Sequence, residues 1–253
     1  MKHLYLVLSL LLAATTQGQT QDTLYVWKAG NLVIKQSIKP VDIDSITFKR
    51  PVVNITQVTI CSQVWKTKNL AVTAYSDGTP IPQVTDPTAW ANLTTGAWCY
   101  YNNDAANNAT YGKLYNWYAA AGIYDAASLT NATLRKKLAP TSWHVPTDAE
   151  WTTLTTCLGD ESVAGGKMKE TGTAHWTSPN TYATNESGFT GLPGGFRYGN
   201  GAFTGIGTYG FWWSSSEYGT TYAWYRYLYY TYGSAFSNSF NKTYGFSVRC
   251  LRD

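Results

Sequence analysis

The sequence predicts an α+β fold, rich in loops, in which two helices accompany several short and mostly antiparallel strands. Gly, Thr, Tyr and Trp are abundant while strong helix formers are scarce, a composition typical of strands and turns. Two stretches repeat apolar residues with the helical period. Charged residues make up 13% of the chain and aromatic residues 15%, so we expect a core packed largely with rings. A chain of 253 residues can form one domain of about 200 residues with additional segments.

The first 19 residues have the pattern of a signal peptide. Lys2 and His3 precede an apolar run at 4–14, and small or polar residues at 15–19 offer a cleavage region. A buried N-terminal element is the alternative interpretation. The run is too short to span a bilayer, and no later stretch approaches the necessary 20 residues, so we expect no transmembrane segment in the mature chain. This pattern predicts a secreted or cell-surface protein.

Residues 20–51 are predicted to form a separate β-rich extension. Apolar and polar residues alternate on both sides of positions 29–31, which indicates a hairpin, and a third short strand is expected at 45–48. Pro51 marks the boundary of the main domain, predicted at 52–253. In that domain the next strands are expected at 53–60, at 63–65 and at 98–101, with a proline-rich loop over 75–90.

The first predicted helix covers 113–121. Leu114, Trp117, Tyr118 and Ala121 stand at the spacing of one helical face, and Gly122 follows as a terminator. The stretch therefore predicts an amphipathic helix that packs on the core.

The second predicted helix has the stronger local signal. Thr147 is a candidate N-cap, and Glu150 three residues later completes a capping box. Trp151, Leu154 and Leu158 form the apolar stripe, and a glycine at 159 ends the helix. The glycine pair at 165–166 is interpreted as part of the loop that follows.

The C-terminal tail at 210–253 is the candidate functional segment. Its tyrosines are interleaved with Ser, Thr, Asn and Gly, a composition that suits a contact surface. On the predicted strand, Tyr225, Tyr227 and Tyr229 share one face. Whether that face is exposed, or is a sheet surface stabilised by cross-strand aromatic pairs, is left open. The candidate ligand-binding residues are Tyr218, Tyr222, Tyr225, Tyr227, Tyr229, Tyr230, Tyr232, Asn238 and Asn241.

Other side chains in and near the tail are predicted to be structural. Trp151, Trp212 and Trp213 are expected in the core, and Glu217 is expected to accept hydrogen bonds from the backbone or from an arginine. Arg249, like the arginines at 197 and 226, is expected to pair with a carboxylate or to stack on an aromatic ring of the tail.

Four cysteines lie after the predicted signal peptide. An even number in an exported chain favours two disulfides, with three possible connectivities. Because Cys99 and Cys250 both lie on predicted strands, we expect the pairs Cys99–Cys250 and Cys61–Cys157. The spacings are too wide for a zinc site, and no metal or other cofactor is expected. Calcium held by backbone carbonyls with Asp160 or Glu186 is the alternative.

Charge and motif patterns exclude several functions. The net charge of +4 is carried by scattered residues, which does not suit a nucleic-acid surface. No G-x-S-x-G elbow accompanies the serines at 214–216. A glycoside hydrolase would need two carboxylates facing each other across a cleft. The candidates for such a pair are Glu161, Glu170, Glu186 and Glu217.

A series of motifs carries a family resemblance. GKLYNWY at 112–118, WHVPTDAEW at 143–151, NESGF at 185–189, LPGG at 192–195, WSSSE at 213–217 and GFSVRC at 245–250 occur in this order. Together they resemble the Fibrobacter succinogenes major paralogous domain family over residues 53–253. That resemblance implies an exported bacterial domain, typical of Bacteroidetes and Fibrobacteres, that occurs in many paralogous copies.

A weaker resemblance concerns the fold. The two helices, the WSSSE turn and the closing VRC strand are similar to the C-type lectin-like fold, in the branch of the formylglycine-generating enzyme and of the variable proteins of diversity-generating retroelements. In those variable proteins a Tyr/Asn/Ser-rich stretch before the last strand binds the ligand, which implies the same place for 218–244. The EPN and QPD motifs of calcium-dependent sugar binding are absent from the sequence, as are the reactive-cysteine motifs of the enzyme.

These observations predict a recognition module outside the cell rather than an enzyme. It would bind a glycan or a protein through the tail, with the glycine-dense loop at 199–210 as an accessory, and its oligomeric state is left open. A carbohydrate-active hydrolase and a structural surface protein without a small ligand are the alternatives.

Overall fold

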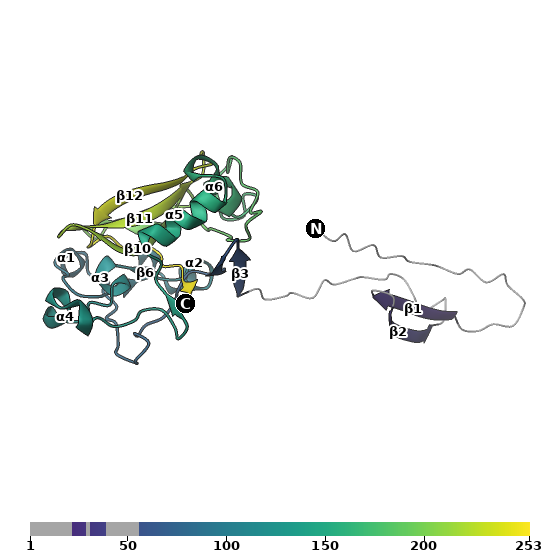
Figure 1. The fold of residues 1–253 in the computed structure, drawn as a ribbon, viewed down its shortest axis with the longest axis horizontal. Coiled ribbons are helices and arrows are strands. Elements are labelled where there is room, and N and C mark those ends of the chain that lie inside the picture. Colours follow the sequence, from purple (N-terminus) through teal and green to yellow (C-terminus); the bar gives the residue numbers. More distant parts are fainter. Residues whose placement is uncertain (1–21, 29–30, 39–55) are drawn as a thin grey trace, which may run out of the picture. The chain divides into compact units, whose positions relative to one another are not determined.

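The computed structural model describes residues 22–28, 31–38 and 56–253 (Figure 1). The chain divides into two compact units, 1–53 and 54–253. In the first unit, β1 (Asp22–Lys28) and β2 (Asn31–Ile38) pair as the predicted antiparallel hairpin. The predicted signal peptide and the strand predicted at 45–48 lie outside the described residues. None of the helices in the described part of the chain has the length and apolar character needed to cross a bilayer.

A five-stranded sheet dominates the second unit, and the tail supplies three of its strands. The order is β12-β11-β10-β8-β9, and only the β8–β10 pair is parallel. Its strands are β8 (Gly194–Arg197), β9 (Phe203–Ile206), β10 (Tyr209–Tyr218), β11 (Tyr222–Tyr229) and β12 (Ala235–Asn241). Figure 1 shows two helices, α5 and α6, packed beside β10, β11 and β12.

The first of these helices, α5 (Asp148–Cys157), confirms the predicted capping box. The Thr147 hydroxyl accepts from the Glu150 N–H, and the Glu150 carboxylate accepts from the Thr147 N–H over 2.7 Å. Trp151 and Leu154 are buried on the side that faces the core.

The second, α6 (Glu161–Met168), contradicts the prediction of a loop after α5. It contains the glycine pair at 165–166 that was expected in a loop. A Cβ at Gly165 would lie 2.1 Å from the carbonyl oxygen of Ser234, and one at Gly166 would lie 2.5 Å from that of Tyr182. The two glycines therefore let backbone from distant segments pack directly on the helix.

The helix predicted at 113–121 is largely wrong. Leu114–Tyr115 is strand β6, paired with β5 (Trp98–Cys99), and only Trp117–Ala120 is helical, as α3. Asn116 begins α3, because its buried Oδ1 accepts from the N–H groups of Ala119 and Ala97. The apolar residues of this stretch have helical spacing because buried residues of strand β6 and of helix α3 follow each other in the sequence. The strand predicted at 98–101 ends early, in the short 3-10 helix η2 (Tyr101–Asn103).

Short helical turns fill the remaining connections. They are α1 (Pro87–Ala91), η3 (Ala105–Asn107), α2 (Asn108–Tyr111), α4 (Ala126–Thr130) and η4 (Ala132–Leu134).

A second sheet joins the two ends of this unit in the order β3-β4-β13-β7. Its strands are β3 (Gln57–Ile60), β4 (Gln63–Lys66), β13 (Leu251–Arg252) and β7 (Trp143–His144). The closing strand expected to end in VRC at 248–250 is not continuous. Single bridges from Gly245, Phe246 and Ser247 reach three different segments before β13 begins.

The five-stranded sheet has an apolar cluster on each face. Trp212 and Leu228 pack with Trp151 on the face that α5 and α6 cover. Trp213 and Tyr225 belong to the cluster on the opposite face. All three tryptophans predicted in the core are at most 1% exposed, which confirms that prediction.

Buried cations bind this domain together through the main chain. Lys113, Lys169, Arg197 and Arg249 are each at most 3% exposed, and each donates to at least one backbone carbonyl. Arg249 donates to the carbonyls of Lys66 and Phe189 and to Asn69 Oδ1.

The three arginines meet the prediction to different degrees. Arg226 pairs with Asp148, as expected. The Arg249 guanidinium stacks on Phe189 at 4.3 Å and that of Arg197 stacks on Trp90 at 4.3 Å. Neither ring belongs to the tail, so that part of the prediction is wrong.

The cysteine predictions are half confirmed. Cys61, in the turn between β3 and β4, forms a disulfide with Cys157 at the end of α5. Cys99 and Cys250 are free thiols, so the predicted bond between them is wrong. They are buried in different clusters, Cys99 beside Trp90 and Cys250 with Phe246. Burial raises the pKa of each thiol to about 12.

Candidate functional site

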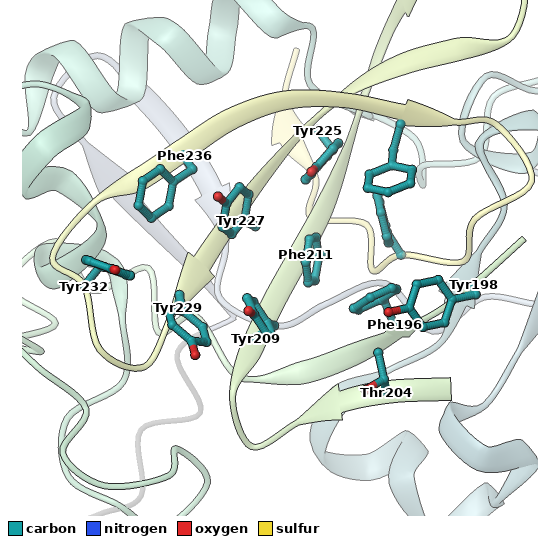
Figure 2. A pocket seen from close by; sticks show the side chains of 12 residues that line it. Phe196, Tyr198, Thr204, Tyr209, Phe211, Tyr225, Tyr227, Tyr229, Tyr232 and Phe236 are labelled. Carbon is teal, nitrogen blue, oxygen red and sulfur yellow. The ribbon is translucent and has the colours of Figure 1, made fainter. Parts of the chain in front are cut away.

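The two faces of β11 serve different purposes. Leu228 packs in the core under α5 and α6, and Arg226 on the same face donates to the Asp148 carboxylate of α5. Tyr225, Tyr227 and Tyr229 lie on the opposite face, where all three line a hollow (Figure 2).

That open face is hollowed into a groove of about 540 Å³, which we call the aromatic groove. This volume is in the range of small-ligand sites, about 300–1,000 Å³. The lining side chains are uncharged, and eleven of the twelve are aromatic. They are Phe196, Tyr198, Thr204, Tyr209, Phe211, Tyr225, Tyr227, Tyr229, Tyr232, Phe236, Phe240 and Phe246.

Cross-strand stacking holds the floor of the aromatic groove. Tyr209 stacks on Tyr229 with ring centroids 4.3 Å apart. Tyr227 lies between Phe211, at 5.4 Å, and Phe236, at 4.7 Å. Such pairs add stability to a sheet. The two interpretations left open by the sequence therefore coexist, because stacked rings form the floor of a solvent-open groove.

Exposure rises toward the ends of the aromatic groove. Tyr225 is 3% exposed and part of the core, whereas Tyr198 is 37% exposed and Tyr232 is 53% exposed. Figure 2 shows these two tyrosines at opposite ends, with Tyr209 and Phe211 between them. Tyr198 and Tyr232 are thus the lining rings with most surface available to a ligand.

The hydroxyls of Tyr225, Tyr227 and Tyr229 remain protonated at neutral pH. Burial raises the pKa of Tyr225. Burial also raises the pKa of Tyr227, and the negative charge of Glu161 raises it further by a smaller amount. For Tyr229, burial is the largest cause of the raised pKa. Each hydroxyl can therefore donate or accept a hydrogen bond while the surface stays uncharged.

A buried lysine fixes the Tyr232 end of the aromatic groove. Lys169, which follows α6, donates from Nζ to the carbonyls of Thr181, Tyr229 and Tyr232. The turn between β11 and β12, which carries Tyr229 and Tyr232, is thereby held to the helix side of the sheet.

Four of the nine predicted ligand-binding residues come together here. They are Tyr225, Tyr227, Tyr229 and Tyr232. Tyr218 and Tyr222 are paired at the tip of the β10–β11 hairpin, and Tyr222 alternates onto the helix-covered side of the sheet.

The other three predicted residues serve local structure. Tyr230 packs against the helix-side cluster. Asn241 Oδ1 accepts from the Thr243 N–H. Asn238 lies opposite Tyr225 in register, and its Oδ1 accepts from the Ser239 N–H.

Six lining residues lay outside the predicted site. Phe236 and Phe240 could have been found, since both occupy one face of the alternating segment at 235–241. Phe196 and Tyr198 could not, because their place depends on the parallel pairing of β8 with β10. The remaining two are Phe211 and Phe246. Thr204 and Tyr209 lie in the segment at 199–210 that was predicted to be an accessory of the site.

The candidate catalytic carboxylates are each engaged elsewhere. Glu217 accepts from Arg135 over 2.9 Å, as predicted. Glu186 pairs with Lys167, Glu170 contacts His175, and Glu161 accepts from the Ser237 N–H. None of these residues lines the aromatic groove. Within the described residues, no three His, Cys, Asp or Glu side chains gather as a metal site would require.

Comparison with known proteins identifies a family but no individual relative. Neither the curated proteins nor the solved structures contain a match to this chain. The model of the Fibrobacter succinogenes major domain matches residues 58–252, which include the five-stranded sheet and the whole aromatic groove. The chain therefore belongs to the Fibrobacter succinogenes major domain family.

Proposed function

We propose that this domain is an extracellular recognition module whose aromatic groove binds a neutral glycan. The observation that carries the proposal is an open groove lined by eleven aromatic rings and no charged side chain. A pyranose ring offers apolar C–H faces to aromatic rings and hydroxyls to polar partners, and tyrosine supplies both kinds of contact on a stiff side chain.

The lack of charge on the lining selects against ionic ligands. An anion or cation entering the aromatic groove would lose water without gaining a counter-charge, which is costly. A neutral sugar chain loses only hydrogen bonds to water, which tyrosine hydroxyls can replace. This site needs no cofactor and no catalytic group.

The edge of the sheet supports a glycan over an extended peptide. Strand β12 is an edge strand, and a peptide could in principle pair with its free amides. Two of those amides are already occupied, because Ser237 donates to Glu161 and Ser239 donates to the Asn238 side chain. Such capping protects an edge from strand addition.

One further feature supports the extracellular setting. The Cys61–Cys157 disulfide is typical of oxidising compartments. We also propose that the domain has a C-type lectin-like fold. The two helices α5 and α6 and the segment that ends at Cys250 support this assignment.

The test measures binding of the purified protein to an array of neutral oligosaccharides, followed by calorimetry on those that bind. The double variant Tyr198→Ala/Tyr232→Ala removes the two exposed rings and leaves the buried floor. Each ring should contribute about 0.5–1.5 kcal/mol, or about 2-fold to 10-fold in affinity. Tyr218→Ala is the matched control, since Tyr218 is also 53% exposed but lies outside the aromatic groove.

The expected result is weaker binding in the double variant and unchanged binding in the control. Affinity should also be constant between pH 5 and 8, because the lining contains no Asp, Glu, His, Lys or Arg. If the double variant binds as well as the wild type, the aromatic groove is not the binding site. If no neutral oligosaccharide on the array binds, the ligand is not a neutral glycan.

A further inference from the structure

A second groove, of about 290 Å³, differs from the first in charge, and we call it the basic groove. Its rim carries Arg135, Lys136 and Lys137, and its lining includes no Asp or Glu. Leu138 and Val145 contribute to an apolar wall. None of its lining residues belongs to the aromatic groove.

Main-chain hydrogen bonds fix the backbone of the segment that carries the rim cations. The Lys136 N–H donates to the carbonyl of Gly122, and the Lys137 carbonyl accepts from the Ser76 N–H. A Cβ at Gly122 would lie 1.8 Å from the Lys136 carbonyl oxygen, so only glycine permits this close packing behind α3. The rim is therefore a fixed segment.

Part of the positive charge on the rim is not neutralised. Arg135 pairs with Glu217 and Lys136 pairs with Asp77, and both carboxylates are more than 40% exposed. Exposed ion pairs of this kind are weak in water. The Lys137 side chain has no hydrogen-bond or ion-pair partner among the described residues.

The neighbouring helix terminus does not supply the anion site. At the start of α5, Asp148 N–H donates to Ser216 Oγ and Glu150 N–H donates to Thr147 Oγ1. His144, which also lines the basic groove, contacts Glu150 and Asp253. An incoming anion would accordingly be held by the side chains of the rim.

We infer that the basic groove binds the carboxylate of a sugar acid. The rim cations would pair with the carboxylate, while the apolar wall would contact the C–H face of the sugar ring. A bare inorganic anion would leave the wall without a partner. The sugar acid could be a free uronate or a uronate unit within a polysaccharide, and both present the same chemistry.

Calorimetry with three probes tests the inference. With the Tyr198→Ala/Tyr232→Ala variant, in which the aromatic groove is impaired, galacturonate and an oligogalacturonide should bind, and a galactose oligomer of the same length should not. Binding of the monomer would identify a free sugar acid as sufficient, and binding of the oligomer alone would identify the polymer as the source. Either result supports the inference, and failure of both acidic probes to bind would overturn it.

Two charge variants separate a site from general attraction. Lys137→Glu should weaken uronate binding about tenfold or more. Lys68→Glu changes the net charge equally at an exposed position outside the basic groove, and it should have less than about a twofold effect. Equal losses in the two variants, or no loss in Lys137→Glu, would overturn the inference.

Two further measurements connect this test with the proposed function. Raising the salt concentration to 0.5 M should weaken uronate binding, since it screens the rim charges. The Tyr198→Ala/Tyr232→Ala variant should keep its uronate affinity while it loses affinity for neutral glycans. A loss of both affinities in that variant would overturn the independence of the two grooves.

Discussion

The Nζ atom of Lys169 lies 2.9 Å from the carbonyl oxygen of Tyr232, so a fully buried cation holds one of the most exposed rings of the aromatic groove. Two further carbonyls share the same ammonium group. Lys169 is therefore a positioning residue for the groove.

Replacing Lys169 by Met should destabilise the domain. Three carbonyls would lose their donor, and each buried acceptor left without a partner costs about 1–3 kcal/mol. Relief of the desolvated charge offsets part of that cost, so we expect a net loss of about 2–4 kcal/mol in the free energy of unfolding. Denaturant melts of the variant measure this loss, and a stability equal to that of the wild type would contradict the prediction.

The same lysine should make stability depend on pH above neutrality. Burial lowers the pKa of Lys169 to about 8, whereas an unfolded lysine has a pKa of about 10.4. Between these values the unfolded chain binds the proton and the native chain does not, so this residue favours folding increasingly as pH rises. Below pH 8 the native state bears the full cost of the buried charge.

Buried thiols act in the opposite direction over the same range. The pKa of Cys99 and of Cys250 is about 12 in the native state, so unfolded thiols ionise first as pH rises. The effect of Lys169 is therefore measured as a difference in the free energy of unfolding between two proteins that both contain these thiols. The stability of the wild type minus that of Lys169→Met should increase from pH 8 to pH 10, and a constant difference would show that Lys169 does not titrate as its burial predicts.

Thiol titration should find two reactive cysteines in the denatured, unreduced protein and almost none in the native protein. Cys99 and Cys250 are buried, and the other two cysteines form the disulfide. A count of four would contradict the disulfide.

Removing the disulfide should be costly. It closes a loop with a sequence separation of 96, so Cys61→Ala/Cys157→Ala should lose about 2–5 kcal/mol. Reductant should destabilise the wild type by a similar amount and leave this variant unchanged. A variant that still responds to reductant would show that another bond is present.

Thr147→Ala should cost about 1 kcal/mol of stability, since it removes the N-cap of α5. Thr153→Ala is the matched control, because Thr153 is exposed in the same helix and its hydroxyl bonds only to the Ala149 carbonyl. Thermal melts should show a lower midpoint for the first variant alone. Equal midpoints would mean that the cap does not stabilise α5.

Gly165→Ala provides a test based on sign. Alanine normally stabilises a helix relative to glycine, by up to about 1 kcal/mol. Here the added Cβ would clash with the Ser234 carbonyl, so we expect a loss of about 1–3 kcal/mol instead. Val163→Ala, at an exposed position of α6, should change stability by less than about 0.5 kcal/mol. A gain in stability for Gly165→Ala would contradict the close packing.

Local chemistry explains which elements could be predicted. The capping box of α5 and the hairpin of β1 and β2 depend on neighbouring residues alone, and both were correct. The errors at α6 and at 113–121 have a nonlocal cause. Gly165 serves a contact with residue 234, and Leu114 pairs with a strand that contains Cys99.

The candidate site was predictable to a similar extent. The alternation of Tyr225, Tyr227 and Tyr229 follows from strand geometry, so their common face could be read from the sequence. The sequence does not reveal that α5 and α6 cover the other face. It also does not reveal that Phe196, on the adjacent strand β8, and Tyr198, in the loop after it, line the groove. Those depend on the strand order, which composition does not encode.

The buried cations also affect how freely this chain can change during evolution. Arg197 donates to the carbonyls of Val84, Thr85 and Gly201. At positions 84 and 85 almost any residue would offer the same acceptor, whereas position 201 requires glycine because a Cβ there would lie 2.5 Å from Pro87. A carboxylate partner would have to be retained together with its arginine, whereas a main-chain partner persists through most substitutions. Surface loops held in this way can diverge in sequence without losing their anchor.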